Sequence, residues 1–184
     1  SHDHQHGHDC SVGVDPHVWL DPVLMRQALP SVAEALAAAL PEQAEAIRQN
    51  AGELEAELIA LDAEFTEAFQ PYAGRSIVTF HSAFNRLAQR YGLNVATTLS
   101  PIESIGNVSP AALDAAIKAV QTHDLKVIYA EPQFSPDAAN MLADRTSAQV
   151  LILDPIGDPN APDRNGYFPM MRYNLKTLVD GLRP

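Results

Sequence analysis

Two stretches of the chain between residues 15 and 70 carry apolar residues at the spacing of amphipathic helices. In the first, Asp21-Pro22 is a favourable helix start, because aspartate caps a helix and proline fits its first position. Apolar residues then recur every four positions, at Leu24, Ala28, Val32, Leu36 and Leu40. Pro30 falls inside this stretch, so we expect a kink or a later helix start.

The second stretch predicts one long helix that opens at Pro41. Its apolar residues alternate by three and four positions, at Ile47, Ala51, Leu54, Leu58, Leu61, Phe65 and Ala68. Mostly acidic side chains occupy the opposite face. This stripe alone is typical of a coiled-coil or bundle helix, and it favours that interpretation over a rigid spine that joins two lobes.

After residue 73 the pattern changes to short apolar runs separated by helical segments. The runs predict strands at 76–80, 95–99, 126–130 and 149–153. Helices are predicted at 83–91, 109–123, 135–147 and 167–182, with a loop rich in Pro, Asp, Asn and Gly at 154–166. Strands separated by helices indicate an α/β fold, with a mainly parallel sheet and helices on both faces.

These patterns divide the chain into four parts: 1–14, 15–40, 41–72 and 73–184. The last part is the α/β lobe, and the third is the long helix in front of it. The first part reads SHDHQHGHDCSVGV and could build no core, so we expect a mobile tail or loop. It holds four of the seven histidines, His2, His4, His6 and His8. Asp, Gln and Gly interrupt them, which disfavours an expression tag with consecutive histidines.

Composition and charge narrow the function classes. The chain has 184 residues, 46% hydrophobic and 19% charged, which is typical of one globular domain with or without an appended element. Its formal net charge of −11 and the lack of a Lys/Arg cluster disfavour binding to nucleic acid or an anionic membrane surface. Cys10 is the single cysteine, so it forms no disulfide within the chain. There is no signal peptide, but a mature exported protein would have lost one.

Three polar residues follow predicted strands directly. His81, Glu131 and Asp154 each stand at the carboxyl end of a strand, where parallel sheets bind ligands. Alone, each has a structural explanation: a hydrogen-bonded histidine, a helix cap before Pro132, or a turn before Pro155. Their convergence on one edge of the sheet favours a binding site.

Four motifs in order carry a resemblance to a known family. They are DPHVWLDP at 15–22, which contains His17, FHSAF at 80–84, AEPQFSP at 130–136 and LDPIGD at 153–158. Together they resemble the metal-specific (zinc/manganese) periplasmic solute-binding proteins of ABC transporters. The His-rich stretch before DPHVWLDP is typical of the zinc-binding branch, and the closing YFPMMRYNLKTLVDGL is similar to that family's last helix.

The resemblance implies a metal site made of His17, His81 and Asp154, although zinc-specific members do not always use the carboxylate. Glu131 is implied to orient a ligand rather than to bind the metal. The helix at 41–72 matches the spine between two lobes, and residues 15–40 match the end of the N-terminal lobe. The chain looks like the C-terminal portion without that lobe, which supplies a further histidine, so we expect an incomplete and weakened site.

The implied function is capture of Zn²⁺ outside the cytoplasm, in the periplasm, and delivery to an ABC import permease without catalysis. Imidazole ligands favour Zn²⁺ over Mn²⁺, which prefers carboxylates. The histidines of the tail are read as a metal-capturing element or a docking site for a metallochaperone.

Two other function classes stay open at this point. One is a zinc hydrolase that uses the same ligands with Glu131 as general base, although the chain has no HExxH motif. The other is an adhesin. A homodimer is also possible if the apolar stripe of the spine is left exposed without the N-terminal lobe.

Overall fold

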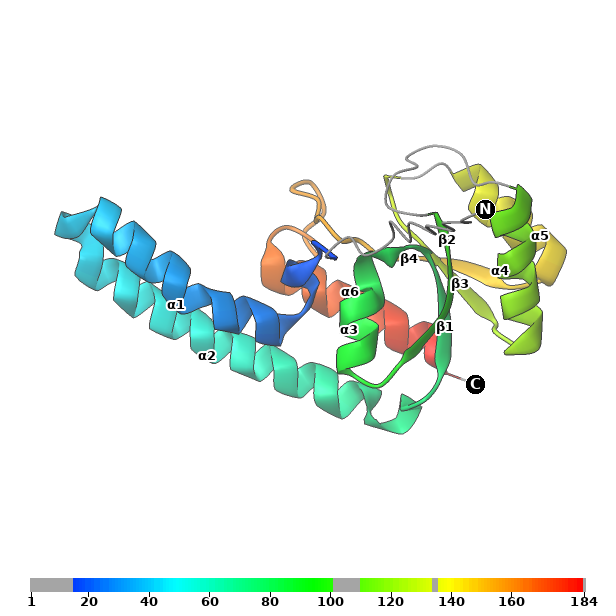
Figure 1. The fold of residues 1–184 in the computed structure, drawn as a ribbon, viewed down its shortest axis with the longest axis horizontal. Helices are drawn as coiled ribbons and strands as arrows, with labels where there is room; N and C mark the ends of the chain where they lie inside the picture. The colour runs from blue at the N-terminus through cyan, green and yellow to red at the C-terminus, as the bar shows by residue number, and fades with distance from the viewer. Residues whose placement is uncertain (1–14, 101–109, 134–135, 184) are drawn as a thin grey trace, which may run out of the picture.

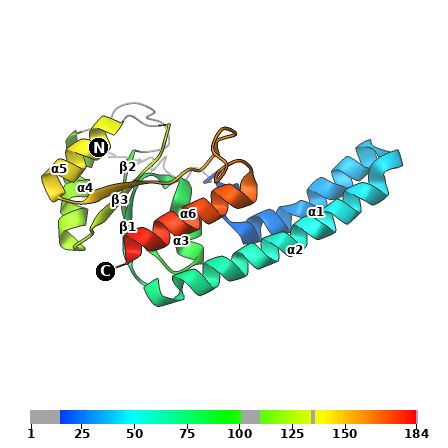
Figure 2. The ribbon, with the colours of Figure 1, turned by 180° about the vertical axis from the view of Figure 1, so that it is seen from behind.

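The fold is a long helical hairpin attached to an α/β lobe (Figure 1). It is seen in a computed structural model that describes residues 15–100, 110–133 and 136–183. Helices α1 (Pro22–Ala39) and α2 (Ala44–Phe69) form the hairpin, and a short 3₁₀ turn at Pro41–Gln43 connects them. Figures 1 and 2 show that only the end of α2 and the start of α1 reach the lobe.

The start of α1 follows from its cap. The Asp21 carboxylate accepts hydrogen bonds from the backbone N–H groups of Val23 (2.9 Å) and Leu24 (3.1 Å), two donors that the first helical turn leaves unsatisfied. The predicted helix start at Asp21-Pro22 is therefore confirmed. Pro30 lies inside the helix, and the expected later start is wrong because the capped first turn begins at Pro22.

The apolar repeat of α1 does not mark its packed face. Ala33 and Ala37 are the buried residues in the second half of this helix, where it packs on α2. Val32, Leu36 and Leu40 are 53%, 48% and 47% exposed. Small alanine side chains allow the two helices to approach closely, so the larger side chains one position before each alanine lie outside the contact.

The stripe of α2 is buried only where the helix meets the lobe. Leu58, Leu61 and Phe65 are buried there together with Phe69, whereas Leu54 is 36% exposed. Glu64 of α2 also forms a two-point ion pair with Arg172 of α6, with N–O distances of 2.8 and 2.9 Å, and this pairing lowers the pKa of the Glu64 carboxyl. The last three turns of α2 are thus part of the core of the lobe.

The predicted α/β fold is confirmed. Four parallel strands lie in the order β2-β1-β3-β4, namely β1 (Ser76–His81), β2 (Asn94–Ser100), β3 (Val127–Ala130) and β4 (Gln149–Ile152). The helices that follow these strands are α3 (Asn85–Arg90), α4 (Pro110–Thr122), α5 (Pro136–Thr146) and α6 (Tyr167–Leu182). The chain moves outward from β1 to β2 and then returns to the other side of β1. The strand order therefore reverses between β1 and β3, which is where open α/β sheets bind ligands.

Alternate side chains of the strands build a core on each face of the sheet. Ile77, Val127 and Tyr129 point to the face covered by α2, α3 and α6. Val78 and Ile128 point to the face covered by α4 and α5. This two-residue alternation, with both faces covered, explains why the strands read as continuous apolar runs. In the ranges that the structure describes, no helix combines the length and apolarity needed to cross a membrane.

Two helical glycines give a test of this packing. A Cβ on Gly181 would lie 2.9 Å from Tyr129 Cζ and 3.0 Å from Val127 Cγ1, whereas a Cβ on Gly52 of α2 would meet nothing within 4 Å. We expect Gly181→Ala to lower the free energy of unfolding by about 1–3 kcal/mol through overpacking. The matched control Gly52→Ala should raise it by about 0.5–1 kcal/mol through helix propensity. Urea denaturation measures both, and equal effects would contradict the packing of α6 on β3.

Candidate metal site

Residues 15–21 are held against the lobe by hydrogen bonds from α3. Arg86 donates to the backbone oxygen of Asp15 from Nη2 at 2.8 Å, and its Nε lies 3.4 Å from Asp15 Oδ2. Arg90 donates from Nε to Asp21 Oδ2 at 2.8 Å, and this bond raises the pKa of the Arg90 guanidinium. The two arginines stand four residues apart on one helix, so a single face of α3 positions both ends of the segment.

Trp19 ties the middle of this segment to the loop after β4. Its indole Nε1 donates to the backbone oxygen of Pro155 at 2.7 Å, and the next residue, Leu20, is fully buried in the core. The ring of Trp19 also contacts His17 edge-on, with centroids 5.3 Å apart. The segment is thereby fixed to β4 as well as to α3.

His17 is buried and its imidazole is oriented. Nδ1 lies 2.7 Å from Asp15 Oδ1, which also accepts the backbone N–H of His17 at 3.0 Å. The carboxylate can only accept, so in the neutral imidazole Nδ1 carries the hydrogen and Nε2 keeps its lone pair. A histidine held by a carboxylate in this way is the usual arrangement of a metal ligand.

His17 and His81 are brought together from distant parts of the chain. Their ring centroids are 4.8 Å apart and the rings are nearly perpendicular, at 87°. Two imidazoles that share one tetrahedral zinc ion, with Zn–N bonds of about 2.0–2.1 Å, have centroids roughly 5 Å apart. The observed spacing therefore suits coordination of one metal ion by both histidines.

Glu131 lies beside His81 with its side chain buried. Glu131 Oε2 is 3.6 Å from His81 Nδ1 and accepts a hydrogen bond from Gln133 Nε2 at 2.6 Å. Within the described residues, its other oxygen, Oε1, has no hydrogen-bond partner. Burial of a carboxylate oxygen without a partner is costly, so this part of the site favours a nearby cation.

Asp154 is 3% exposed, and both oxygens of its carboxylate accept hydrogen bonds. Oδ1 accepts the backbone N–H groups of Ile156 (3.0 Å) and Gly157 (2.8 Å), and Oδ2 accepts Arg164 Nη1 at 3.0 Å. Asn174 of α6 binds the backbone N–H and C=O of Asp154 at 2.8 and 2.7 Å. Asp154 therefore organises the loop after β4, which is the structural role that its position before Pro155 also allowed.

The structure thus brings three of the predicted residues into contact. His81 meets both His17 and Glu131, whereas Asp154 is paired with Arg164. Across 15–100, 110–133 and 136–183, no group of three or more His, Cys, Asp or Glu side chains is arranged to hold a metal ion. His2, His4, His6 and His8, as well as Cys10, lie outside the described residues.

Sequence reasoning did not identify the residues that support the site, namely Asp15, Arg86, Arg90, Arg164 and Asn174. The role of Asp15 could have been inferred from the sequence, because it stands two residues before His17 in the DPHVWLDP motif. The four-residue spacing of Arg86 and Arg90, which puts both on one helix face, gave a weaker indication.

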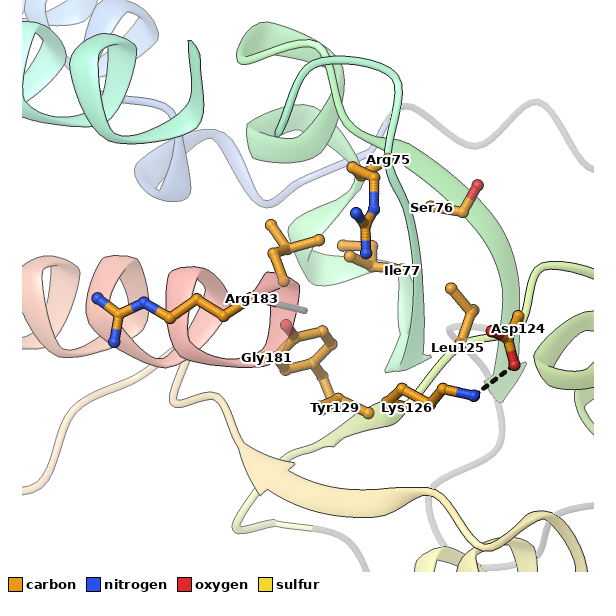
Figure 3. Close-up of a pocket in the computed structure, with 11 residues that line it drawn as sticks. Arg75, Ser76, Ile77, Asp124, Leu125, Lys126, Tyr129, Gly181 and Arg183 are labelled. Carbon is orange, nitrogen blue, oxygen red and sulfur yellow. Dashed lines mark hydrogen bonds and ion pairs between the residues drawn. The ribbon is translucent and has the colours of Figure 1, made fainter. Parts of the chain in front are cut away.

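A pocket of about 310 Å³ lies at the opposite edge of the sheet (Figure 3). It opens between the starts of β1 and β3 and the end of α6, where Arg75, Lys126 and Gly181 are among its lining residues. His17, His81, Glu131 and Asp154 are not among its lining residues. The metal-site chemistry is therefore separate from this pocket.

Comparisons with known proteins show which family the chain resembles over most of its length. A family model described as zinc-uptake complex component A, periplasmic (ZnuA) matches residues 1–181. The chain is similar to the zinc-binding protein AdcA of Streptococcus pyogenes serotype M1, with 33% identity over 173 residues, which cover 89% of this chain and 32% of that protein. It is also similar to the high-affinity zinc uptake system protein ZnuA of Haemophilus ducreyi, with 32% identity over 147 residues, 78% of this chain and 46% of that protein.

A solved structure with a similar fold is the laminin-binding protein Lbp of Streptococcus pyogenes. The TM-score is 0.79 with 31% sequence identity, and the match covers 92% of this chain and 65% of that chain. The chain therefore spans about a third to a half of the length of the two curated relatives and somewhat under two thirds of this solved structure.

The orientation of His17 can be tested without any metal. We expect the neutral form of His17 in the wild-type protein to carry its hydrogen on Nδ1, because Asp15 accepts from that atom. Asp15→Ala should give a mixture of both tautomers, since the fixed acceptor is gone. Long-range ¹H–¹⁵N NMR correlations distinguish the two forms. Asp163→Ala, at an exposed position in the loop after β4, is the control, and an unchanged tautomer in Asp15→Ala would refute the assigned role of Asp15.

Proposed function

Because the chain belongs to the family of periplasmic zinc-uptake components (ZnuA), we propose that it is a receptor that binds Zn²⁺ outside the cytoplasm and passes it to an ABC import permease. The observation that carries this proposal is the pair of imidazoles contributed by His17 and His81, with centroids 4.8 Å apart. Nitrogen ligands of this type suit Zn²⁺ better than Mn²⁺. The ion is the cargo of the protein, and its binding needs no chemical step.

The two histidines are the proposed principal ligands, and the surrounding residues support them. Asp15 leaves the lone pair of His17 Nε2 available, and Arg86 in turn holds Asp15. A ligand that is pre-oriented in this way loses little conformational freedom when the metal binds. The polar anchors of residues 15–21 thus contribute to affinity without touching the ion.

Glu131 is proposed to stabilise the bound state through His81. Its Oε2, 3.6 Å from His81 Nδ1, is close enough to accept a hydrogen bond after a small movement. Coordination through Nε2 of His81 would favour that bond, because the metal withdraws electron density from the ring. The negative charge of Glu131 would also compensate the charge of the ion.

Asp154 is proposed as an auxiliary carboxylate ligand. Its Oδ2 accepts one hydrogen bond, from Arg164, and so retains accepting capacity for a metal ion. The remaining coordination positions would be filled by water or by a histidine from outside the described residues. His2, His4, His6 and His8 are the proposed source of local metal capture, which raises the effective concentration of Zn²⁺ near the site.

The alternative functions have weaker support. Membership in a family of uptake components favours binding without catalysis over the hydrolase hypothesis. The predicted homodimer depends on the apolar stripe of the spine helix, in which Leu54 is 36% exposed. That homodimer and the docking of a metallochaperone stay predictions.

A competitive titration with Zn²⁺ against a chromophoric chelator tests the proposed ligands. We expect one site in the wild-type protein and an affinity at least about 100-fold lower in His81→Ala, because loss of a direct ligand exceeds the roughly 10–100-fold cost of removing a supporting residue. The control His123→Ala, at an exposed position just after α4, should bind like wild type. Zinc binding that is indifferent to His81 would mean that the proposed site is wrong.

The role of Glu131 has two consequences of opposite sign. Glu131→Gln should weaken Zn²⁺ binding by about 10–100-fold, as expected for a residue that supports a ligand. The same variant should raise the melting temperature of the metal-free protein, because it removes a buried charge with an unpartnered oxygen. Differential scanning fluorimetry with and without Zn²⁺ measures both effects. Glu42→Gln, exposed at the tip of the hairpin, is the control, and parallel changes with and without metal would contradict the assignment.

A further inference from the structure

An arginine in the loop after β4, Arg164, pairs with Asp154, and we propose that it competes with a metal ion for this carboxylate and so determines the preference of the site for zinc over manganese. The inference rests on the proposed metal site of His17 and His81. It assigns to Arg164 a role in specificity, because it decides how much carboxylate the site offers.

The Arg164 side chain is held tightly at this position. Its Nη1 donates to Asp154 Oδ2 at 3.0 Å, and its Nη2 lies 3.7 Å from Asp158 Oδ2. The guanidinium also lies over the ring of Tyr173, with Cζ 5.2 Å from the ring centroid. The side chain of Asp154 is only 4% exposed and that of Arg164 21%, so solvent screens the ion pair little.

The backbone of the loop fixes the arginine as well. Arg164 donates its N–H to Ala161 O at 2.9 Å and accepts the N–H of Asp158 at 3.1 Å. Gly157 has a φ of 89°, and a Cβ there would lie 2.9 Å from Arg164 O, so the loop closes on itself at a position that requires glycine. The guanidinium is therefore preorganised against Asp154.

This pairing affects the two metals differently. A carboxylate that shares its charge with an arginine is a weaker donor, and movement toward a metal would break a buried ion pair. Zn²⁺ is satisfied by imidazoles, whereas Mn²⁺ depends on carboxylate oxygens. The cost of displacing Arg164 therefore falls mainly on Mn²⁺.

A purely structural role of Arg164 would have a different consequence. If Arg164 only stabilised the loop, its removal would loosen the site and weaken both metals in parallel. If it restrains Asp154, its removal should strengthen Mn²⁺ binding while Zn²⁺ binding changes little. The ratio of the two affinities thus separates the explanations.

The test is competitive titration of the metal-free chain with Zn²⁺ and with Mn²⁺. In Arg164→Gln we expect Mn²⁺ to bind at least about tenfold more tightly, with less than about a threefold change for Zn²⁺, because carboxylate donors suit manganese. Arg164→Lys, which keeps the charge, should restore most of the wild-type ratio. Arg172→Gln is the matched control, since Arg172 pairs with Glu64 on the helical side of the lobe. The double variant Arg164→Gln/Asp154→Asn should lose the gain in Mn²⁺ affinity.

In a folded Arg164→Gln, the inference would be overturned by an unchanged ratio of the two affinities or by a parallel loss of affinity for both metals. If Arg164→Gln does not fold, Asp154→Asn tests the same point in the native loop. If Arg164 restrains Asp154, the Zn²⁺ affinity of this variant should change less than about threefold, because the imidazoles provide most of the zinc binding. A larger loss would overturn the inference. Failure of the proposed function is distinguishable, because wild-type protein would then show no zinc site that depends on His81.

Discussion

The hydrogen bonds of Asp21 connect the helical hairpin to the lobe and so determine where His17 lies. This carboxylate is 2% exposed, accepts two backbone N–H groups at the start of α1, and pairs with Arg90 of α3. Loss of an N-cap alone costs about 1 kcal/mol, and here the same group also neutralises a partly buried arginine. Since His17 precedes Asp21 by four residues, any shift of this junction would move the imidazole relative to His81.

The fold could be predicted from the sequence because its pattern is local. Each strand is a short apolar run and each helix has a turn or cap residue at its ends, so the sequence pattern predicts all four strands and the helices between them. The edge at which His81, Glu131 and Asp154 converge follows from parallel strands alone. The order β2-β1-β3-β4 adds that these three residues end neighbouring strands, with His81 and Glu131 on either side of the reversal in strand order.

The parts that could not be predicted depend on tertiary geometry. Helix α1 and its cap contain two repeats with the same four-residue period, offset by one position. One consists of Val32, Leu36 and Leu40, and the other of Ala33 and Ala37. Periodicity therefore cannot decide which of them faces α2, and hydrophobicity pointed to the larger residues. The hydrogen bonds of Arg86, Arg90 and Arg164 join residues whose proximity exists only after folding. Arg164 in particular changes the interpretation of Asp154 from a free ligand to one that is already paired.

The two buried carboxylates at this edge, Asp154 and Glu131, have different partners, and the difference bears on where the proposed site would attract a cation. Asp154 is neutralised by Arg164 and by two backbone N–H groups of its own loop. Glu131 receives a hydrogen bond from the neutral amide of Gln133 and lies next to His81. The positive charge of Arg164 therefore lies beside the end of β4. The carboxylate of Glu131, which has no arginine or lysine partner among the described residues, lies at the ends of β1 and β3, next to His81. If the proposed site is right, a metal ion that enters this edge would meet His17, His81 and the unpaired oxygen of Glu131, whereas Asp154 is already paired with Arg164.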